Sequence, residues 1–272
     1  MTSAPTLLPL LFEFDWGTVR EYLFRDIVVD AAWRTLYLSV FAQTIGVGLG
    51  VLAAVARNLK IPIASQVAAV YVWFFRGTPL LLQLLFWFVA LPQLGPNDVG
   101  FYSREWLILT PFQAALIGLA INEGAYMAEI VRAGIEAIER GQMDAAKALG
   151  MTNLQAMRLV ILPQALRIIV PPTGNEFIAM LKNSSLASVV SYPELLFVVR
   201  GQYARNFQVL ELVTVAAIWY LFFTSIFSII QGEVEARLRP EQERTGIIAR
   251  LSRAFNPPPD WYGRVPGTGE RR

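Results

Sequence analysis

The chain has 272 residues, of which 55% are hydrophobic and 16% charged, and its formal net charge is +2. With a mean hydropathy of +0.46, it is too apolar for one soluble domain. It contains no cysteine and no histidine, which excludes a disulfide framework, imidazole metal ligands, a Ser/His/Asp triad and a Cys/His pair. The composition therefore indicates an integral membrane protein and disfavours most enzyme classes.

Residues 1–30 are predicted to lie outside the membrane core. Residues 1–11 contain a short apolar patch but no basic segment and no small-residue cleavage site, so we do not expect a removable signal peptide. Trp16, Tyr22 and Phe24 follow before the first apolar run, and aromatic residues favour the membrane interface. We therefore expect a segment that lies on the outer membrane surface.

Five apolar stretches have the length of roughly 20 residues that crosses a hydrocarbon core of about 30 Å. The second is interrupted at Arg76-Gly77-Thr78-Pro79, but each half is too short to cross alone, so we expect one long broken helix. The predicted fold class is an all-α integral membrane domain over residues 31–235. Its five spans are residues 33–56, 64–91, 107–131, 164–181 and 209–230.

Lysine and arginine are concentrated after the first, third and fifth spans. Because basic loops stay on the cytoplasmic side, the loop of residues 132–163 and the C-terminus are predicted to be cytoplasmic, and the N-terminus outside. The basic loops suit contact with anionic lipid and give little reason to expect nucleic acid as a partner.

The loop of residues 132–163 has the pattern of two short helices. Residues 144–149 are rich in alanine, Asp144 would stabilise the N-terminal end of a helix, and Gly150 suits a left-handed cap. Thr152, followed three residues on by Gln155, fits a capping box that restarts a helix leading toward Pro163. The small side chains leave the first helix slim enough to enter a groove; a connector packed on its own protein is the alternative.

Asp144-Ala145-Ala146, Gly150 and Val160-Ile161-Leu162-Pro163 resemble the loop of permease subunits of ATP-binding-cassette (ABC) importers, where Glu-Ala-Ala, Gly and Ile-x-Leu-Pro occupy these places. Residues 75–84, 128–134 and 182–186 resemble the polar amino-acid branch of that family. The resemblance runs from about residue 16 to residue 231. It implies the five-helix transmembrane domain of a type I importer, which moves polar amino acids across the bacterial inner (plasma) membrane by alternating access. The residues that would couple it to an ATPase are Gly141, Asp144, Ala145, Ala146, Gly150, Leu162 and Pro163.

The same resemblance implies the partners. The chain has no Gly-rich phosphate loop, so it is expected not to be an enzyme, and ATP and Mg²⁺ would be bound by a separate ABC ATPase dimer. No cofactor or metal is expected in this chain itself. Five helices are too few for a two-repeat transporter, so a second permease subunit, identical or related, is expected. A periplasmic or lipid-anchored solute-binding protein would deliver the amino-acid substrate.

Arg76 is the least expected residue, because a guanidinium within an apolar span costs at least ~2.5 kcal/mol unless it faces a cavity or a partner. Pro79 has no N–H, so the carbonyl of Phe75 is predicted to lack an intrahelical partner. A guanidinium can bind a carboxylate through two parallel hydrogen bonds, so Arg76 beside free backbone groups is suited to a substrate carboxylate. The alternative is an arginine that is bonded to a neighbouring helix or extends to the membrane surface.

Further polar residues complete the candidate substrate site. Glu123 and Glu129 could accept a substrate ammonium or a cationic side chain. Alternatively, Glu129 pairs with Arg132 and Glu123 lies near the cytoplasmic surface. The candidate substrate-binding residues are Arg76, Thr78, Glu123, Glu129, Lys182, Asn183 and Ser184.

The last segment, residues 236–272, combines basic residues with apolar ones at helical spacing. This pattern predicts an amphipathic helix on an anionic leaflet, with a solvated tail as the alternative. Two rival functions remain for the chain as a whole. An ATP-independent secondary transporter or channel would show inverted repeats, and a membrane enzyme would need a nucleophile with its base or a carboxylate–metal cluster.

Overall fold

The computed structural model describes residues 14–58, 62–93 and 107–238, and the regular secondary structure in these ranges is helical. Four helical segments are long and apolar enough to cross a membrane. They contain α2 (Asp26–Asn58), α5 (Pro111–Glu136), α8 (Leu162–Asn183) and α10 (Val209–Leu238). A bent pair of helices brings the number to five if it is one span, as the sequence predicts.

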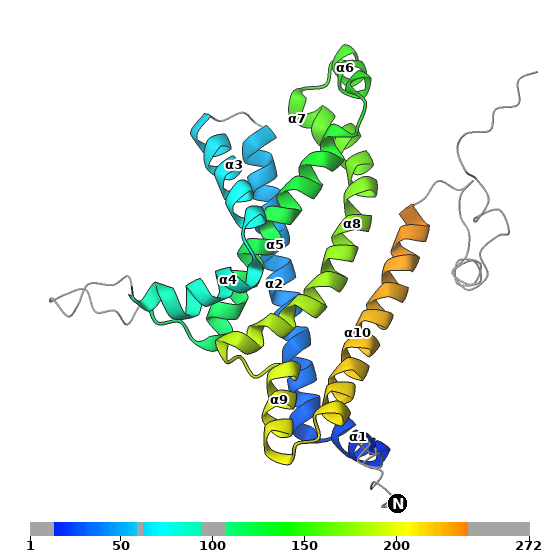
Figure 1. Ribbon diagram of the computed structural model, residues 1–272. Helices are drawn as coiled ribbons and strands as arrows, with labels where there is room; N and C mark the ends of the chain where they lie inside the picture. The colour runs from blue at the N-terminus through cyan, green and yellow to red at the C-terminus, as the bar shows by residue number, and fades with distance from the viewer. Residues whose placement is uncertain (1–13, 59–61, 94–106, 239–272) are drawn as a thin grey trace, which may run out of the picture.

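The bent pair consists of α3 (Pro62–Gly77) and α4 (Leu80–Leu85). A π-helical turn (Phe86–Ala90) and a 3₁₀ turn (Leu91–Gln93) extend α4. The two halves meet at an angle of 106°. The break predicted around Arg76 to Pro79 is therefore confirmed, but the halves are almost perpendicular, and α4 turns sideways out of the bundle (Figure 1).

The third and fourth spans differ from the prediction for identifiable reasons. The third span starts at Pro111 because Thr110 and Gln113 form a capping box there. The fourth begins earlier, at Asn153, and continues to Val190. A π-helical turn (Met157–Ile161) precedes Pro163, whose missing N–H interrupts the regular bonding pattern, and a 3₁₀ helix (Ser184–Val190) follows α8.

The most extensive helix contact is between α2 and α5. Gly46 and Gly50 lie one turn apart on α2, and both are buried against α5. A Cβ at Gly50 would lie 2.4 Å from the Cβ of Met127, so no side chain fits there. Gly48, on the exposed side of the same helix, has open space around it. Small residues thus let the two backbones approach, as is common within membranes.

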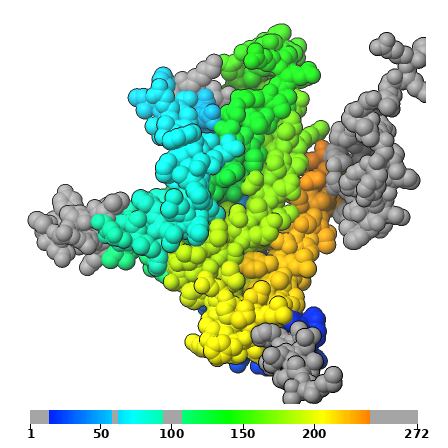
Figure 2. Space-filling model, in the orientation of Figure 1, coloured from blue at the N-terminus to red at the C-terminus, as the bar shows by residue number. Residues whose placement is uncertain are grey.

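The two ends of the bundle are built differently (Figures 1 and 2). At one end lie α1 (Trp16–Leu23) and α9 (Leu195–Asn206), and at the other lie α6 (Arg140–Ala148) and the C-terminal end of α10. The α1 helix is fastened to α10 because the Trp219 indole donates to the carbonyl of Leu23 (3.1 Å). Trp16 and Phe24 remain largely exposed, which agrees with a segment at the membrane surface.

The α6 helix is framed by two long helices. Three residues separate it from the end of α5, and after it α7 (Asn153–Ala156) leads through the π-helical turn into α8. The prediction that this helix begins at Asp144 is wrong, because α6 begins at Arg140 and Asp144 lies in its middle. Asp144 therefore does not stabilise the N-terminal end. The predicted tail helix lies outside the described residues.

Candidate functional site

A pocket of about 500 Å³ opens where the α3–α4 break meets α5 and α8. Four of the predicted substrate-binding residues lie in its wall: Arg76, Thr78, Glu123 and Asn183. The remaining lining residues are Gly77, Pro79, Leu80, Asn122, Tyr126, Glu176 and Leu186. Residues more than 100 positions apart in the sequence thus line one polar cavity between the helices.

Arg76 is the next-to-last residue of α3, beside the break. Its guanidinium lies 5.4 Å from the centre of the Tyr126 ring and 3.9 Å from a carboxylate oxygen of Glu129. Its side chain is 43% exposed. Arg76 is therefore held loosely, by a long ion pair and an aromatic face, and one side of its guanidinium remains available to a ligand.

Glu129 lies outside the pocket lining and has two closer partners than Arg76. One carboxylate oxygen accepts from Arg57 on α2, and the other accepts from Arg132 one turn further along α5 (2.7 Å). The pairing of Glu129 with Arg132 confirms the structural alternative. Arg132 also bonds Glu136 (2.6 Å), so three arginines share two carboxylates.

Glu123 lies deep in the bundle, with only 5% of its surface exposed. The alternative that places it near the cytoplasmic surface concerns its depth in the membrane and stays a prediction. One carboxylate oxygen accepts a hydrogen bond from the Gln43 amide on α2 (2.9 Å). Glu176, one turn after Pro172 on α8, lines the same pocket. The pocket therefore contains two carboxylates and one guanidinium.

The carbonyl of Phe75 lacks a helical partner, as predicted from Pro79, and side chains replace it. The amides of Gln83 and Asn122 both donate to it at 3.0 Å. The hydroxyl of Thr78 donates to the carbonyl of Phe74 (2.9 Å), so its one O–H is not available to a substrate. Gln83 was not predicted, although a lone amide within Leu80–Leu85 was a visible signal.

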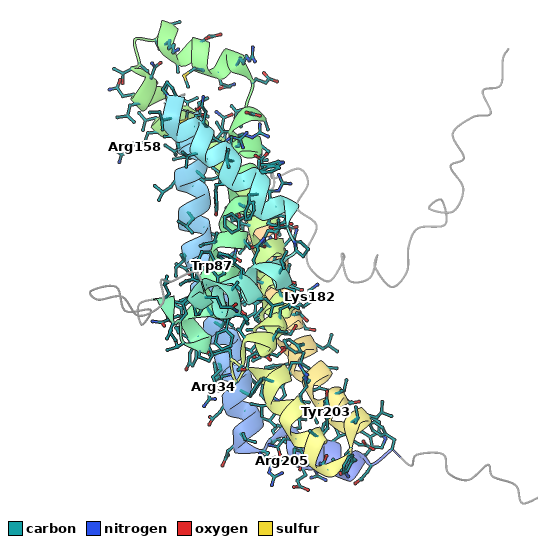
Figure 3. All side chains as sticks on the ribbon, turned by 60° about the vertical axis from the view of Figure 1, so that its left-hand side comes forward. Arg34, Trp87, Arg158, Lys182, Tyr203 and Arg205 are labelled. Atoms are coloured by element: carbon teal, nitrogen blue, oxygen red, sulfur yellow. The ribbon has the colours of Figure 1, made fainter. Side chains whose placement is uncertain are left out.

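Two other predicted residues lie outside the pocket lining. Lys182 is exposed on the surface of the bundle at about its middle (Figure 3). Ser184 is fully buried, and its hydroxyl donates to the carbonyl of Leu181 (2.7 Å). This hydrogen bond stabilises the turn where α8 ends, and the buried hydroxyl is not available to a ligand.

The predicted coupling residues form the α6 end of the molecule. Gly150 has a φ of +81°, and its N–H donates to the carbonyl of Lys147 (2.9 Å) while Met151 donates to that of Ala146 (3.1 Å). This is the Schellman arrangement, and it confirms the predicted cap. The capping box of Thr152 and Gln155 is confirmed as well.

The surface of α6 is divided between an inner and an outer side. Ala146 is 4% exposed and packs on the rest of the loop, whereas Gly141, Asp144 and Ala145 are exposed. Leu149 is 81% exposed beyond the end of the helix. Leu162 and Pro163 are also exposed, where the loop returns to α8. The outer side of this end of the bundle therefore presents small and apolar side chains on its surface.

Comparison with known proteins agrees with this arrangement. The family model described as "Binding-protein-dependent transport system inner membrane component" matches residues 46–240. The arginine transport system permease protein ArgU of Corynebacterium glutamicum is 42% identical over 93% of this chain and 80% of its own length. The glutamine transport system permease protein GlnP of Escherichia coli is 36% identical over 84% of this chain and 99% of its own.

A solved structure described as "an amino acid ABC transporter with histidines" is similar in both sequence and fold. It matches with a TM-score of 0.74 and 37% identity, over 83% of this chain and 99% of its own. The relatives of this chain are transport subunits of the inner membrane. In this family, the ATPase and the solute-binding protein are separate partner subunits. The chain belongs to the family of inner-membrane permease components of binding-protein-dependent ABC importers.

Proposed function

We propose that this permease forms half of an import pathway for polar amino acids with a cationic side chain. The other half is a second permease subunit, identical or related. An ATPase dimer, which binds ATP and Mg²⁺, docks at the α6 end, and a solute-binding protein docks at the opposite end, where α1 and α9 lie. The α6 end is cytoplasmic in this arrangement, and the first described helix lies outside.

The charge of the pocket supports the cationic substrate class. Arg76 is suited to the α-carboxylate, because a guanidinium binds a carboxylate through two parallel hydrogen bonds. Glu123 and Glu176 then face the α-ammonium and the cationic end of the side chain. A bound cation favours ionisation of both carboxyl groups, and when both are ionised they exceed the guanidinium by one negative charge, which matches the single positive charge of arginine or lysine. An acidic amino acid would bring like charges together at a desolvated site.

The relatives support the broader class of polar amino acids. Two of them are described as permeases for arginine and glutamine, and the solved transporter is described as containing histidines. Polar amino acids are common to these descriptions. The surplus carboxylate in the pocket is our reason for placing this chain with the importers of cationic amino acids.

The proposed cycle is alternating access. The binding protein delivers the amino acid to the outer side, ATP binding closes the ATPase dimer against α6, and the pocket opens to the other side. Gly141, Asp144 and Ala145 on the outer side of α6 would contact the ATPase, with Leu162 and Pro163 beside them. Ala146 and Gly150 would fix the shape of the helix from within.

Competition uptake in proteoliposomes that contain the complete transporter tests this proposal. Glu123→Gln and Glu176→Gln each remove one pocket carboxylate with little change in shape. We expect the ratio of arginine to glutamine uptake to fall at least severalfold in each variant. Glu233→Gln is the matched control, because Glu233 pairs with Arg237 on α10 and does not line the pocket. A uniform loss of uptake for both substrates, or an unchanged ratio, would overturn the cationic assignment.

A further inference from the structure

Gln83 connects the two halves of the broken span with one buried side chain. It belongs to α4, after the break, and is only 5% exposed. Its amide nitrogen lies 3.0 Å from the carbonyl of Phe75 and 2.8 Å from the hydroxyl of Thr78. A third contact, of 3.1 Å, reaches the carbonyl of Thr78. Gln83 therefore turns back across the break and binds residues on the far side.

Asn122 attaches this arrangement to α5. Its amide nitrogen donates to the side-chain oxygen of Gln83 (3.1 Å) and to the carbonyl of Phe75 (3.0 Å). The donors and acceptors form a chain from Asn122 through Gln83 and Thr78 to the carbonyl of Phe74. Such chains polarise each bond in turn and are strengthened by a low-dielectric interior. We call the side chains of Gln83, Asn122 and Thr78 the break clamp.

The break clamp holds the part of the chain that forms one wall of the pocket. The five consecutive residues from Arg76 to Leu80 line the cavity, and the clamp binds backbone groups within and directly before this segment. The guanidinium of Arg76 is itself only loosely held. The direction from which Arg76 approaches a ligand is therefore determined by the backbone that the clamp fixes.

We propose that Gln83 is a positioning residue for substrate capture, which holds the break so that Arg76 meets the substrate carboxylate. This inference rests on the proposed function, in which Arg76 binds that carboxylate. Gln83 is not among the residues that line this pocket, so its role is to position and not to contact the substrate. Its loss changes binding only through Arg76 and its backbone.

Equilibrium binding of radiolabelled L-arginine to the purified permease–ATPase complex, without the binding protein, tests this role. Agmatine, which is arginine without its carboxylate, is the competing ligand. In Gln83→Leu we expect arginine to bind about tenfold more weakly and agmatine to bind as it does to the wild type. The preference for arginine over agmatine then falls, as it does in Arg76→Ala. A purely structural loss would weaken both ligands equally.

The matched control is Gln93→Leu, because Gln93 belongs to the same bent pair, is exposed and, among the described residues, donates to the carbonyl of Val89 (2.9 Å) rather than across the break. This control should bind both ligands as the wild type does. Gln83→Glu keeps the size of the side chain but not its N–H donors, and we expect it to lose the same preference. If neither Gln83 variant assembles with the ATPase, the clamp belongs to the fold alone and the proposal is wrong.

The double variant separates this inference from the proposed function. If Gln83 acts through Arg76, adding Gln83→Leu to Arg76→Ala produces no further loss of arginine affinity. If the double variant loses arginine affinity by the product of the two single losses, the inference is wrong. If Arg76→Ala alone keeps the wild-type preference for arginine over agmatine, the carboxylate role of Arg76 fails, whatever Gln83 does. If only the Gln83 variants keep that preference, the proposed function stands and the inference fails.

Discussion

Replacing glycines on two faces of α2 should change stability in opposite directions. At Gly50, a Cβ would lie 2.4 Å from the Cβ of Met127 and 2.8 Å from the backbone nitrogen of Ala128. A backbone atom cannot rotate away, so α2 and α5 must separate, at an overpacking cost of about 1–3 kcal/mol or more. At Gly48, nothing lies within 4 Å, and the higher helix propensity of alanine contributes up to ~1 kcal/mol.

The gain in helix propensity applies at both sites, so we expect Gly50→Ala to be less stable than Gly48→Ala by the overpacking cost of about 1–3 kcal/mol, with the wild type between them. Thermal unfolding of the detergent-purified protein, followed by intrinsic fluorescence, provides the comparison. The two midpoints should lie several degrees apart on opposite sides of the wild type. If both variants shift the midpoint in the same direction, the close α2–α5 approach does not control stability and the packing argument is wrong.

Three other predictions concern coupling, the arginine cluster and pH. Gly150→Pro cannot adopt the φ of +81° and loses an N–H bond, so substrate-stimulated ATPase activity should fall while membrane insertion persists; wild-type stimulation would contradict this. Arg57→Gln frees one oxygen of Glu129 for Arg76, so arginine should bind severalfold more weakly in the equilibrium assay, and unchanged affinity would show that Arg76 is not drawn away. Burial raises the pKa of Glu194 from 4.5 to about 7, against three hydrogen bonds that lower it. The folded protein then holds this proton more tightly than the unfolded chain, so stability should fall by up to about 3 kcal/mol as the pH rises from about 4.5 to about 7. Glu194→Gln should flatten that dependence of the unfolding midpoint on pH, and an equal slope in both proteins would refute it.

The number and order of the spans could be predicted because each depends on local composition. Apolar runs of fixed length, Pro79 in the second span and the cap at Gly150 are all readable from neighbouring residues. The bend angle could not be predicted, since a missing N–H shows where a helix breaks and not how far it turns. The 106° bend is accompanied by hydrogen bonds to the carbonyl of Phe75 from Gln83 and from Asn122, and Asn122 belongs to α5, 47 positions away from that carbonyl.

The candidate site was predicted in part for the same reason. Arg76 and Glu123 stand out as charges in apolar runs, and both line the pocket. Glu129 stands out equally, but Arg57, 72 positions away, pairs with it from another helix. Charge inside a span indicates that a partner or a cavity exists, and only the tertiary arrangement distinguishes the two.

The framing of α6 by α5 and α8 has a mechanical consequence. Glu123 lies 13 residues before the end of α5, and Glu176 lies 14 residues after the start of α8. At about 1.5 Å per residue, each pocket carboxylate is on a lever arm of roughly 20 Å, so a tilt of about 5° displaces it by ~2 Å.

The two arms differ in stiffness. The α5 arm has no proline between Glu123 and its end, whereas Pro171 and Pro172 interrupt the bonding of the α8 arm just before Glu176. A displacement of α6 should therefore rotate α5 as a rod while α8 bends at its prolines. Distances between spin labels on either side of Pro172 should change between the nucleotide-free and ATP-bound transporter, and those along α5 should stay constant. A bend of equal size in α5 and α8 would show that the two helices do not differ in stiffness.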